Sequence, residues 1–174
     1  MLNFPQIDPV IFQIGPLSVR WYGLMYLLAF GIGYLAIRVL DRYRRLGLGG
    51  EGASDLLFHA MLGVIVGGRL GYVVFYNLSY YLAHPLHVFA VWQGGMSFHG
   101  GLLGVIAAVL FFSRRKGLPV LLVADIMAAA AAPGLFFGCI GNFINGELWG
   151  RVTDLPWGIV FPAAGALPRH PSQL

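Results

Sequence analysis

The stretch GVIVGGRLGYVVFY, residues 63–76, is almost wholly apolar and contains one charged side chain, Arg69. Continued toward the N-terminus, this apolar run is long enough for a helix that crosses a membrane. Gly63, Gly67 and Gly71 recur at every fourth position, and such a stripe of small residues lets another helix approach closely in lipid. The stretch therefore predicts a transmembrane helix with one glycine face and an intramembrane arginine.

The composition of the whole chain points to the same class of protein. Of the 174 residues, 58% are hydrophobic and 10% are charged, with a mean hydropathy of +0.75. Soluble domains usually contain about 25% charged residues, so this chain has too few charges to cover a water-soluble globule. The net charge of +4 does not indicate nucleic-acid binding, because the basic residues are divided among short loops. The composition predicts an all-α, polytopic membrane protein.

Similar apolar segments recur along the chain. A span needs about 20 apolar residues, and we expect about four spans, of which the third is slightly short. Glycines before the third span predict irregular backbone, which is tolerated at membrane depth only where protein or water covers it. We expect a single membrane domain over residues 1–174, with spans at roughly Trp21–Val39, Asp55–Tyr76, Phe98–Ser113 and Pro119–Cys139.

The positions of Lys and Arg predict the orientation of these spans. Cytoplasmic loops of membrane proteins are enriched in Lys and Arg. Both loops that follow the first and third spans are therefore predicted to be cytoplasmic, which places the N-terminus outside. Seven of the 11 basic residues lie in these two places: Arg38, Arg42, Arg44, Arg45, Arg114, Arg115 and Lys116.

Arg69 is the first candidate for a functional side chain. An arginine inside a membrane costs about 2.5–3.5 kcal/mol and is a functional candidate by default. It lies about 21 Å from the start of its span at Asp55, which is in the outer half of the membrane. One interpretation is that its guanidinium binds a phosphate, since arginine suits bidentate phosphate contacts. The other is a structural role, in which Arg69 snorkels or pairs with a buried acid such as Glu147.

His99 is the second candidate, at the outer start of the third span. Glycine pairs on both sides of it, Gly94-Gly95 and Gly100-Gly101, remove side-chain bulk around the imidazole. A helix begins there, and its free N–H groups favour an anion. The imidazole can exchange protons near neutral pH. The alternative is an interfacial histidine whose partners are purely structural.

The third candidate is the polar segment GCIGNFINGELWGR, residues 138–151, which follows the fourth span directly. Its Asn142 and Glu147 are expected at the outer side, at a depth similar to that of Tyr22 and Tyr72. A polar group of residues facing the outer leaflet suggests a phospholipid headgroup site, whereas a helix cap and a solvated loop are the simpler alternative. The histidines lack paired ligands at the spacing of a metal site, so we expect neither a metal nor another cofactor.

Several of these segments together resemble a known family, the bacterial prolipoprotein diacylglyceryl transferases. Each piece alone is weakly specific, but the set occurs in order and with the spacing of the family, and it covers nearly the whole chain. The matching segments are IDPVIFQIGPLSVRWYGLMY (7–26), GGRLGY (67–72), GGMSFHGGLLG (94–104), GNFINGELWGR (141–151) and FPAAGALPRHPSQL (161–174).

The resemblance implies a reaction, its partners and a location. A diacylglyceryl group would move from phosphatidylglycerol to the lipobox cysteine thiol of a prolipoprotein signal peptide, in the bacterial inner membrane, by a multi-pass protein. The essential histidine of the HGG motif is His99, which would act as the base or as a phosphate partner. The resemblance further implies catalytic roles for Asn142 and Glu147, and substrate binding by Tyr22, Arg69, Tyr72 and the side chain at position 139.

The sequence departs from the family pattern in two ways. Relatives usually carry an arginine that contacts the headgroup where this chain has Cys139. The family pattern also continues beyond Leu174, so we expect a C-terminally truncated chain, the N-terminal part of a longer fold. The alternative hypothesis is an inactive homologue that only binds lipid, and it predicts oligomers through the Gly63, Gly67 and Gly71 stripe.

Overall fold

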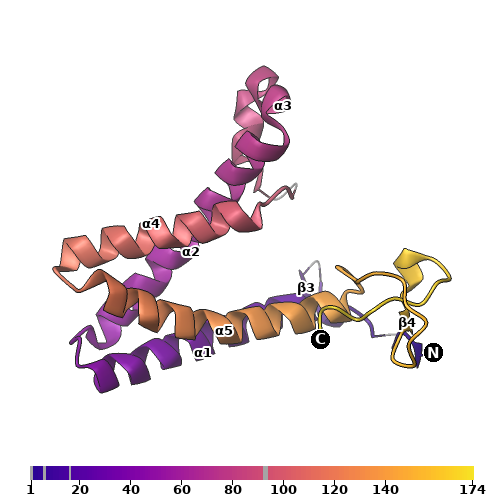
Figure 1. Cartoon of the computed structure of the whole chain (residues 1–174), viewed down its shortest axis with the longest axis horizontal. Helices are drawn as coiled ribbons and strands as arrows, with labels where there is room; N and C mark the ends of the chain where they lie inside the picture. The colour runs from indigo at the N-terminus through magenta and orange to yellow at the C-terminus, as the bar shows by residue number, and fades with distance from the viewer. Residues whose placement is uncertain (1, 6, 16, 92–93) are drawn as a thin grey trace. The chain divides into compact units, whose positions relative to one another are not determined.

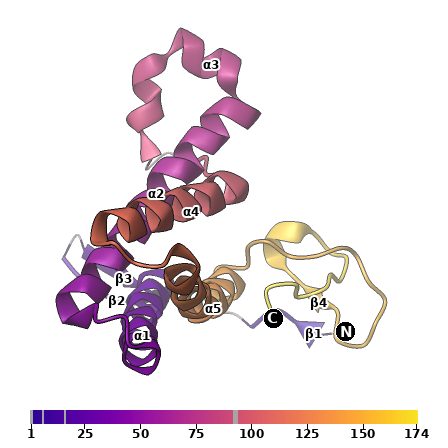
Figure 2. The same ribbon diagram turned by 60° about the vertical axis from the view of Figure 1, so that its left-hand side comes forward.

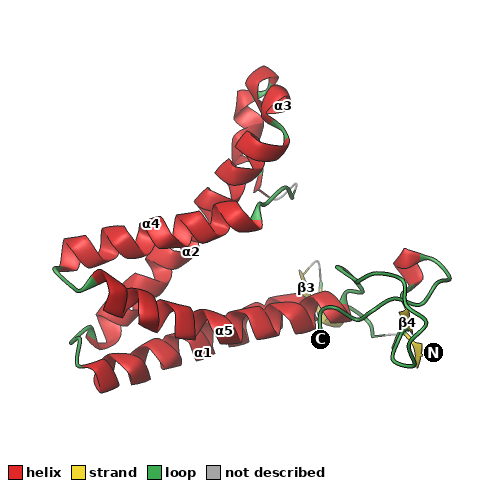
Figure 3. Ribbon diagram, viewed as in Figure 1, coloured by secondary structure: helices red, strands yellow, loops and turns green. Residues whose placement is uncertain are grey.

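The computed structural model describes residues 2–5, 7–15, 17–91 and 94–174. The chain is mainly helical (Figure 3). Its long helices are α1 (Trp21–Arg44), α2 (Gly49–Tyr76), α4 (Phe98–Lys116) and α5 (Val120–Ile144) (Figure 1). Shorter elements are β1 (Leu2–Asn3), β2 (Val10–Ile14), β3 (Leu17–Arg20), α3 (Leu78–Ala83), the 3-10 helices η1 (Pro85–Phe89) and η3 (Pro162–Ala164), and β4 (Ile159–Val160).

Within the described residues, four helices are long and apolar enough to cross a membrane: α1, α2, α4 and α5. This confirms the prediction of an all-α polytopic protein with about four spans. The helices are longer than the predicted spans, since α1 continues to Arg44 and α2 begins at Gly49. Backbone hydrogen bonding does not stop where the apolar sequence stops, so polar loop residues extend the helices.

The chain divides into two compact units, Met1–Gly33 with Ala130–Leu174 and Tyr34–Ala129. We call them the terminal unit and the central unit. Helices α1 and α5 each contribute residues to both units. The expected single membrane domain over residues 1–174 stays a prediction.

Helices α2 and α4 of the central unit pack backbone against backbone through glycines (Figure 1). A Cβ atom added to Gly63 would lie 2.5 Å from the carbonyl oxygen of Gly104, and one added to Gly71 would lie 2.7 Å from the Cα of Gly100. A Cβ atom on Gly67 would meet the backbone of both facing glycines. The glycine stripe that the alternative hypothesis assigned to oligomers is therefore occupied by α4.

Two ion pairs tie the loops at one end of the central unit. Lys116 Nζ lies 3.2 Å from Asp55 Oδ2, which joins the end of α4 to the first part of α2. Arg44 Nη2 lies 3.5 Å from Asp125 Oδ2, which joins the end of α1 to the first turns of α5. The two clusters of basic residues thus lie at the same end of this unit, although their cytoplasmic location stays a prediction.

The terminal unit contains small strands that the sequence interpretation did not foresee. Strands β2 and β3 form an antiparallel hairpin, and β1 pairs in parallel with β4 (Figure 2). Phe161 is fully buried, and its ring centroid lies 5.2 Å from that of Phe4 and 6.3 Å from that of Phe143. This aromatic cluster packs the segment after α5 onto the N-terminal strand.

The glycine contact generates a first prediction. Gly104→Ala should lower the thermal midpoint in detergent, because its Cβ atom would overlap the Gly63 carbonyl oxygen. Forcing extra atoms into a well-packed contact costs about 1–3 kcal/mol. Circular dichroism melts would measure the loss. Gly31→Ala in α1 is the control, since a Cβ atom there meets nothing within 4 Å. Equal midpoints for the two variants would contradict the backbone contact.

Candidate functional site

Arg69 is buried in α2, with 4% of its surface exposed. Arginine carries five N–H donors in a planar fork, and every one of them meets a backbone carbonyl oxygen. Nε donates to Val88 at 2.8 Å, Nη1 to Gly94 at 2.5 Å and Gly95 at 3.2 Å, and Nη2 to His87 at 2.6 Å and Ala90 at 3.1 Å. The guanidinium carbon also lies 5.2 Å from the centroid of the Tyr81 ring. Arg69 therefore holds the segment that connects α2 to α4.

The two glycines bound by Arg69 have a backbone that other residues rarely adopt. Gly94 and Gly95 have φ angles of 82° and 79°, a region that only glycine enters at little cost. A Cβ atom added to Gly95 would lie 2.6 Å from Cε1 of Tyr72 and 3.0 Å from Nη1 of Arg69. Tyr72 and Arg69 thus pack on the same peptide, one through its ring and the other through hydrogen bonds.

His99 is exposed in the first turn of α4. Ser97 caps this helix, because its side-chain oxygen accepts a hydrogen bond from the Gly100 N–H at 3.2 Å. The Ser97 N–H donates in turn to the carbonyl oxygen of Gly68 in α2, at 2.9 Å. The first N–H groups of a helix have no acceptor within the helix, so the backbone around His99 can attract an anion.

The central unit brings three of the predicted site residues to one end of the α2 and α4 pair. Arg69 and Tyr72 come from the last part of α2, and His99 from the first turn of α4. The close approach of Gly71 to Gly100 sets this arrangement, since these glycines are the chain neighbours of Tyr72 and His99. The arrangement offers an exposed imidazole at a helix N-terminus, at the same end of the helix pair as a buried arginine whose donors all meet carbonyl oxygens.

In the terminal unit, the end of α5 brings Asn142 and Glu147 together through their backbone. The Glu147 N–H donates to the Asn142 carbonyl oxygen at 2.9 Å, and the Gly146 N–H donates to that of Phe143 at 2.9 Å. Gly146 has a φ angle of 67°. These bonds and a left-handed glycine form a Schellman motif, which ends a helix and turns the chain sharply. Glu147 leaves this turn with an exposed side chain.

Tyr22 lies against the same part of α5. A Cβ atom added to Gly141 would lie 2.7 Å from Cδ2 of Tyr22, so the ring rests on the helix backbone beside Asn142. The Tyr22 hydroxyl lies 3.4 Å from that of Tyr26. Cys139 is half-buried and two residues before Gly141. The terminal unit therefore gathers Tyr22 and the predicted residues of α5, and their union with the central-unit residues in one headgroup site stays a prediction.

Sequence reasoning missed two side chains that fix the Glu147 segment. The amide of Gln173 donates to the Glu147 carbonyl oxygen, and Arg169 Nη1 donates to that of Gly150 at 3.3 Å. Gln173 is buried. Both lie in the family-like segment at residues 161–174, which was the available signal, but a sequence match does not reveal hydrogen-bond partners.

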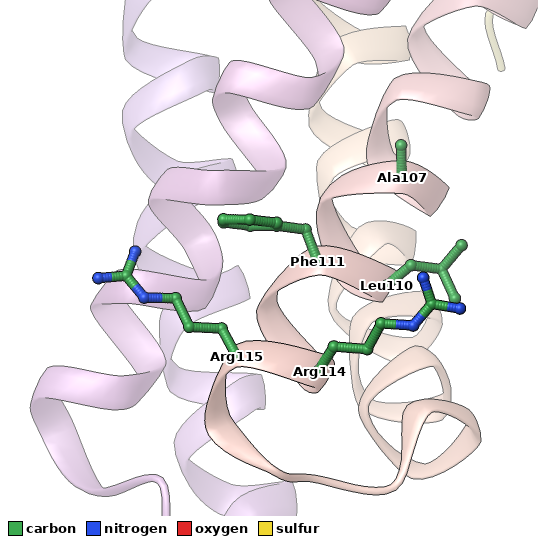
Figure 4. A pocket seen from close by; sticks show the side chains of 5 residues that line it. All are labelled: Ala107, Leu110, Phe111, Arg114 and Arg115. Carbon is green, nitrogen blue, oxygen red and sulfur yellow. The ribbon is translucent and has the colours of Figure 1, made fainter.

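A surface groove of about 540 Å³ lies elsewhere on α4. Its lining side chains come from successive turns of this one helix, and Arg114 and Arg115 extend to different sides of it (Figure 4). It contains none of the predicted site residues. The groove is lined by Ala107, Leu110, Phe111, Arg114 and Arg115.

Comparison with known proteins agrees with the family resemblance. A family model described as prolipoprotein diacylglyceryl transferase matches residues 9–174. Curated relatives named phosphatidylglycerol–prolipoprotein diacylglyceryl transferase include one from Geobacter sulfurreducens, 60% identical over 99% of this chain and 66% of the relative. Others come from Bordetella avium, 56% identical over 100% and 67%, and Aliivibrio salmonicida, 56% identical over 99% and 61%. The chain thus spans about two thirds of the length of these relatives.

The helix end in the terminal unit generates a second prediction. Gly146→Ala should destabilise the turn that carries Glu147, because a left-handed conformation costs a residue with a Cβ atom about 1–2 kcal/mol. Limited proteolysis between Asn145 and Gly150 should become faster. Gly138→Ala in the same helix is the control, since its Cβ atom meets nothing within 4 Å. Identical cleavage rates in the two variants would show that the turn does not require a glycine at position 146.

Proposed function

We propose that this chain, which belongs to the prolipoprotein diacylglyceryl transferase family, transfers the diacylglyceryl group of phosphatidylglycerol to the lipobox cysteine thiol of a prolipoprotein signal peptide. The observation that carries the proposal is the family match over residues 9–174, which includes the HGG motif at His99. The polar side chains at the ends of α4 and α5 support it, because this reaction needs a base and donors for a phosphate.

The proposed reaction is a displacement at an sp³ carbon. The cysteine sulfur attacks the glycerol carbon that carries the phosphate ester, so a carbon–sulfur bond forms and the carbon–oxygen bond to phosphate breaks. Glycerol phosphate leaves with the electron pair of that bond, and the thiol proton passes to a base. A free thiol has a pKa of about 8.5, and the thiolate is the nucleophile. A nearby base therefore accelerates the attack.

We assign the role of this base to His99. Its imidazole is exposed at the start of α4, where it can reach a substrate without breaking a hydrogen bond to any residue that the structure describes. The N-terminus of the helix favours negative charge, which suits both the thiolate and the departing phosphate. His99 can act on either group, as base or as phosphate partner.

We assign Asn142 and Glu147 to the same reaction as polar groups that bind and orient the reacting headgroup. The Schellman turn at the end of α5 fixes the spacing of their backbones. Tyr22 and Tyr72 are proposed to line the phosphatidylglycerol site, whereas Arg69, whose N–H donors all meet backbone carbonyl oxygens, is not assigned a headgroup contact. Both tyrosines pack their rings on glycine backbone, which is a rigid support for a hydroxyl group.

The second candidate function is lipid binding without diacylglyceryl transfer, and Cys139 is the residue that favours it. Position 139 is where the family resemblance implies an arginine, and the cysteine here is half-buried. A thiol cannot supply the charge-assisted, bidentate phosphate contact that an arginine makes. The two candidates share a phosphatidylglycerol site and differ in whether a thioether forms.

The chain is a multi-pass membrane protein. We propose the bacterial inner membrane as its location, with the basic end of the central unit in the cytoplasm and His99 toward the outer leaflet. The distribution of Lys and Arg supports this orientation, as do the ion pairs that keep both basic clusters at one end of the unit.

The central prediction is that His99→Ala lowers the transfer rate about 100-fold or more, the loss expected for a general base. Purified chain in phosphatidylglycerol vesicles would be mixed with a lipobox peptide, and mass spectrometry would follow the diacylglyceryl thioether. His59→Gln in α2 is the matched histidine control and should keep the wild-type rate. A wild-type chain that binds the lipid and yields no thioether would favour the second candidate. Equal rates in wild type and His99→Ala would remove His99 from the reaction.

Cys139→Arg should raise the affinity for phosphatidylglycerol. A hydrogen bond to a charged group is worth about 1.5–3 kcal/mol, which corresponds to about tenfold or more in the dissociation constant. Titration of the lipid into nanodiscs of an uncharged lipid would measure it. Cys139→Ser, which adds no charge, should bind as the wild type does. Unchanged affinity in Cys139→Arg would show that position 139 does not face the headgroup.

A further inference from the structure

We propose that Arg69 is a positioning residue for His99 and does not itself contact the phosphate. It binds backbone carbonyl groups in residues 87–90 and in Gly94 and Gly95, and through these bonds it sets where α4 begins. The inference rests on the proposed function of His99. The sequence suggested instead that Arg69 contacts the phosphate. A positioning role predicts a loss of kcat, whereas a phosphate contact predicts a loss of lipid affinity.

The first argument is that the N–H donors of the guanidinium already have acceptors. All five N–H donors already meet carbonyl oxygens, at 2.5 to 3.2 Å, and the side chain is 96% buried. A phosphate that approached Arg69 would have to displace some of these carbonyl groups. Each displaced carbonyl group would lose a hydrogen bond to a charged donor, which is costly, and the carbonyl of Ala90 belongs to a buried residue. The side chain therefore has a structural role, in which it binds the backbone between α2 and α4.

The carbonyl groups of this segment also need hydrogen-bond donors, which is a second argument for the structural role of Arg69. The carbonyl groups that Arg69 binds belong to the 3-10 helix η1, to the residue after it and to the two glycines with positive φ, all outside the α-helices and strands. Irregular backbone at membrane depth must be covered and hydrogen-bonded by protein. The planar fork of an arginine reaches several carbonyls at once, whereas lysine has only three donors on a single nitrogen.

The short path from Arg69 to His99 is the third argument. Arg69 binds the carbonyls of Gly94 and Gly95, and its chain neighbour Gly68 accepts the hydrogen bond from Ser97. Ser97 caps α4, and His99 lies in the turn that it caps. Adjacent residues of α2 thus fix the segment just before His99 at successive points. Loss of Arg69 would release the segment and move the imidazole.

The test compares Arg69→Lys and Arg69→Gln in the vesicle transfer assay. Because a misplacement of about 1 Å can cost about 100-fold in rate, both variants should lose about that much in kcat. The KM for phosphatidylglycerol, and its dissociation constant in a His99→Ala background, should stay within about threefold of the parent value. If Arg69 contacts the phosphate, the lipid dissociation constant should instead rise in Arg69→Gln, and Arg69→Lys should keep part of the lipid affinity. That result would overturn the inference.

Gly95→Ala disturbs the same segment with Arg69 intact. Its Cβ atom would overlap the Tyr72 ring, and its backbone has a positive φ. The variant should reproduce the kcat loss of Arg69→Gln, and a wild-type kcat would contradict positioning through the loop. Arg114→Gln, at the other end of α4, is the control for loss of an arginine and should keep the wild-type rate.

A second measurement does not depend on activity. Hydrogen–deuterium exchange at the Ser97 and Gly101 amides, whose acceptors are Gly68 and Ser97, should become faster in Arg69→Gln than in the wild type. Unchanged exchange at both amides would overturn the inference. If the wild-type chain yields no thioether, the proposed function fails, and the exchange rates still decide whether Arg69 holds the start of α4.

Discussion

The hydrogen bonds between one buried guanidinium and five carbonyl oxygens organise the central unit around Arg69. A membrane penalises an arginine by about 2.5–3.5 kcal/mol, and it also penalises irregular backbone that lacks hydrogen-bond partners. Placing the two together reduces both penalties. The backbone just before α4 can then leave α-helical geometry at Gly94 and Gly95, which have positive φ angles, and the helix that carries His99 starts at a defined residue.

The glycine contact between α2 and α4 makes this arrangement possible. Gly100 approaches the Cα of Gly71, and its N–H group bonds to the side chain of Ser97. The same residue therefore belongs to the helix contact and to the turn that carries His99. Lipid tails are as apolar as the side chains of these helices, so the hydrophobic effect does not drive the helices together. Close packing of small residues is therefore a main source of helix association. A larger side chain at this position would disturb the helix contact and the histidine together.

Composition and apolar segments were sufficient to predict the membrane class and the long helices, because a span must match the thickness of the hydrocarbon layer. Arg69 and His99 could be singled out for the same reason, as polar groups in or beside apolar runs. The partners of Arg69 could not be predicted, since carbonyl groups have no sequence signature and those that it binds lie 18 to 26 residues away. The hairpin of β2 and β3 was also missed, because a few strand residues beside a long apolar helix carry little periodicity.

The hydrogen bonding of the Arg69 guanidinium can be measured directly by nuclear magnetic resonance. The chain would be prepared with ¹⁵N-labelled arginine in nanodiscs, and the Nε–H signal of Arg69, assigned by Arg69→Lys, would be followed as phosphatidylglycerol is added. We expect a slowly exchanging signal, since this proton is bonded to the Val88 carbonyl oxygen at 2.8 Å, and a chemical shift that the lipid leaves unchanged. A rapidly exchanging signal, or a large shift on adding the lipid, would show that the Arg69 guanidinium is not held by the backbone and can contact the headgroup.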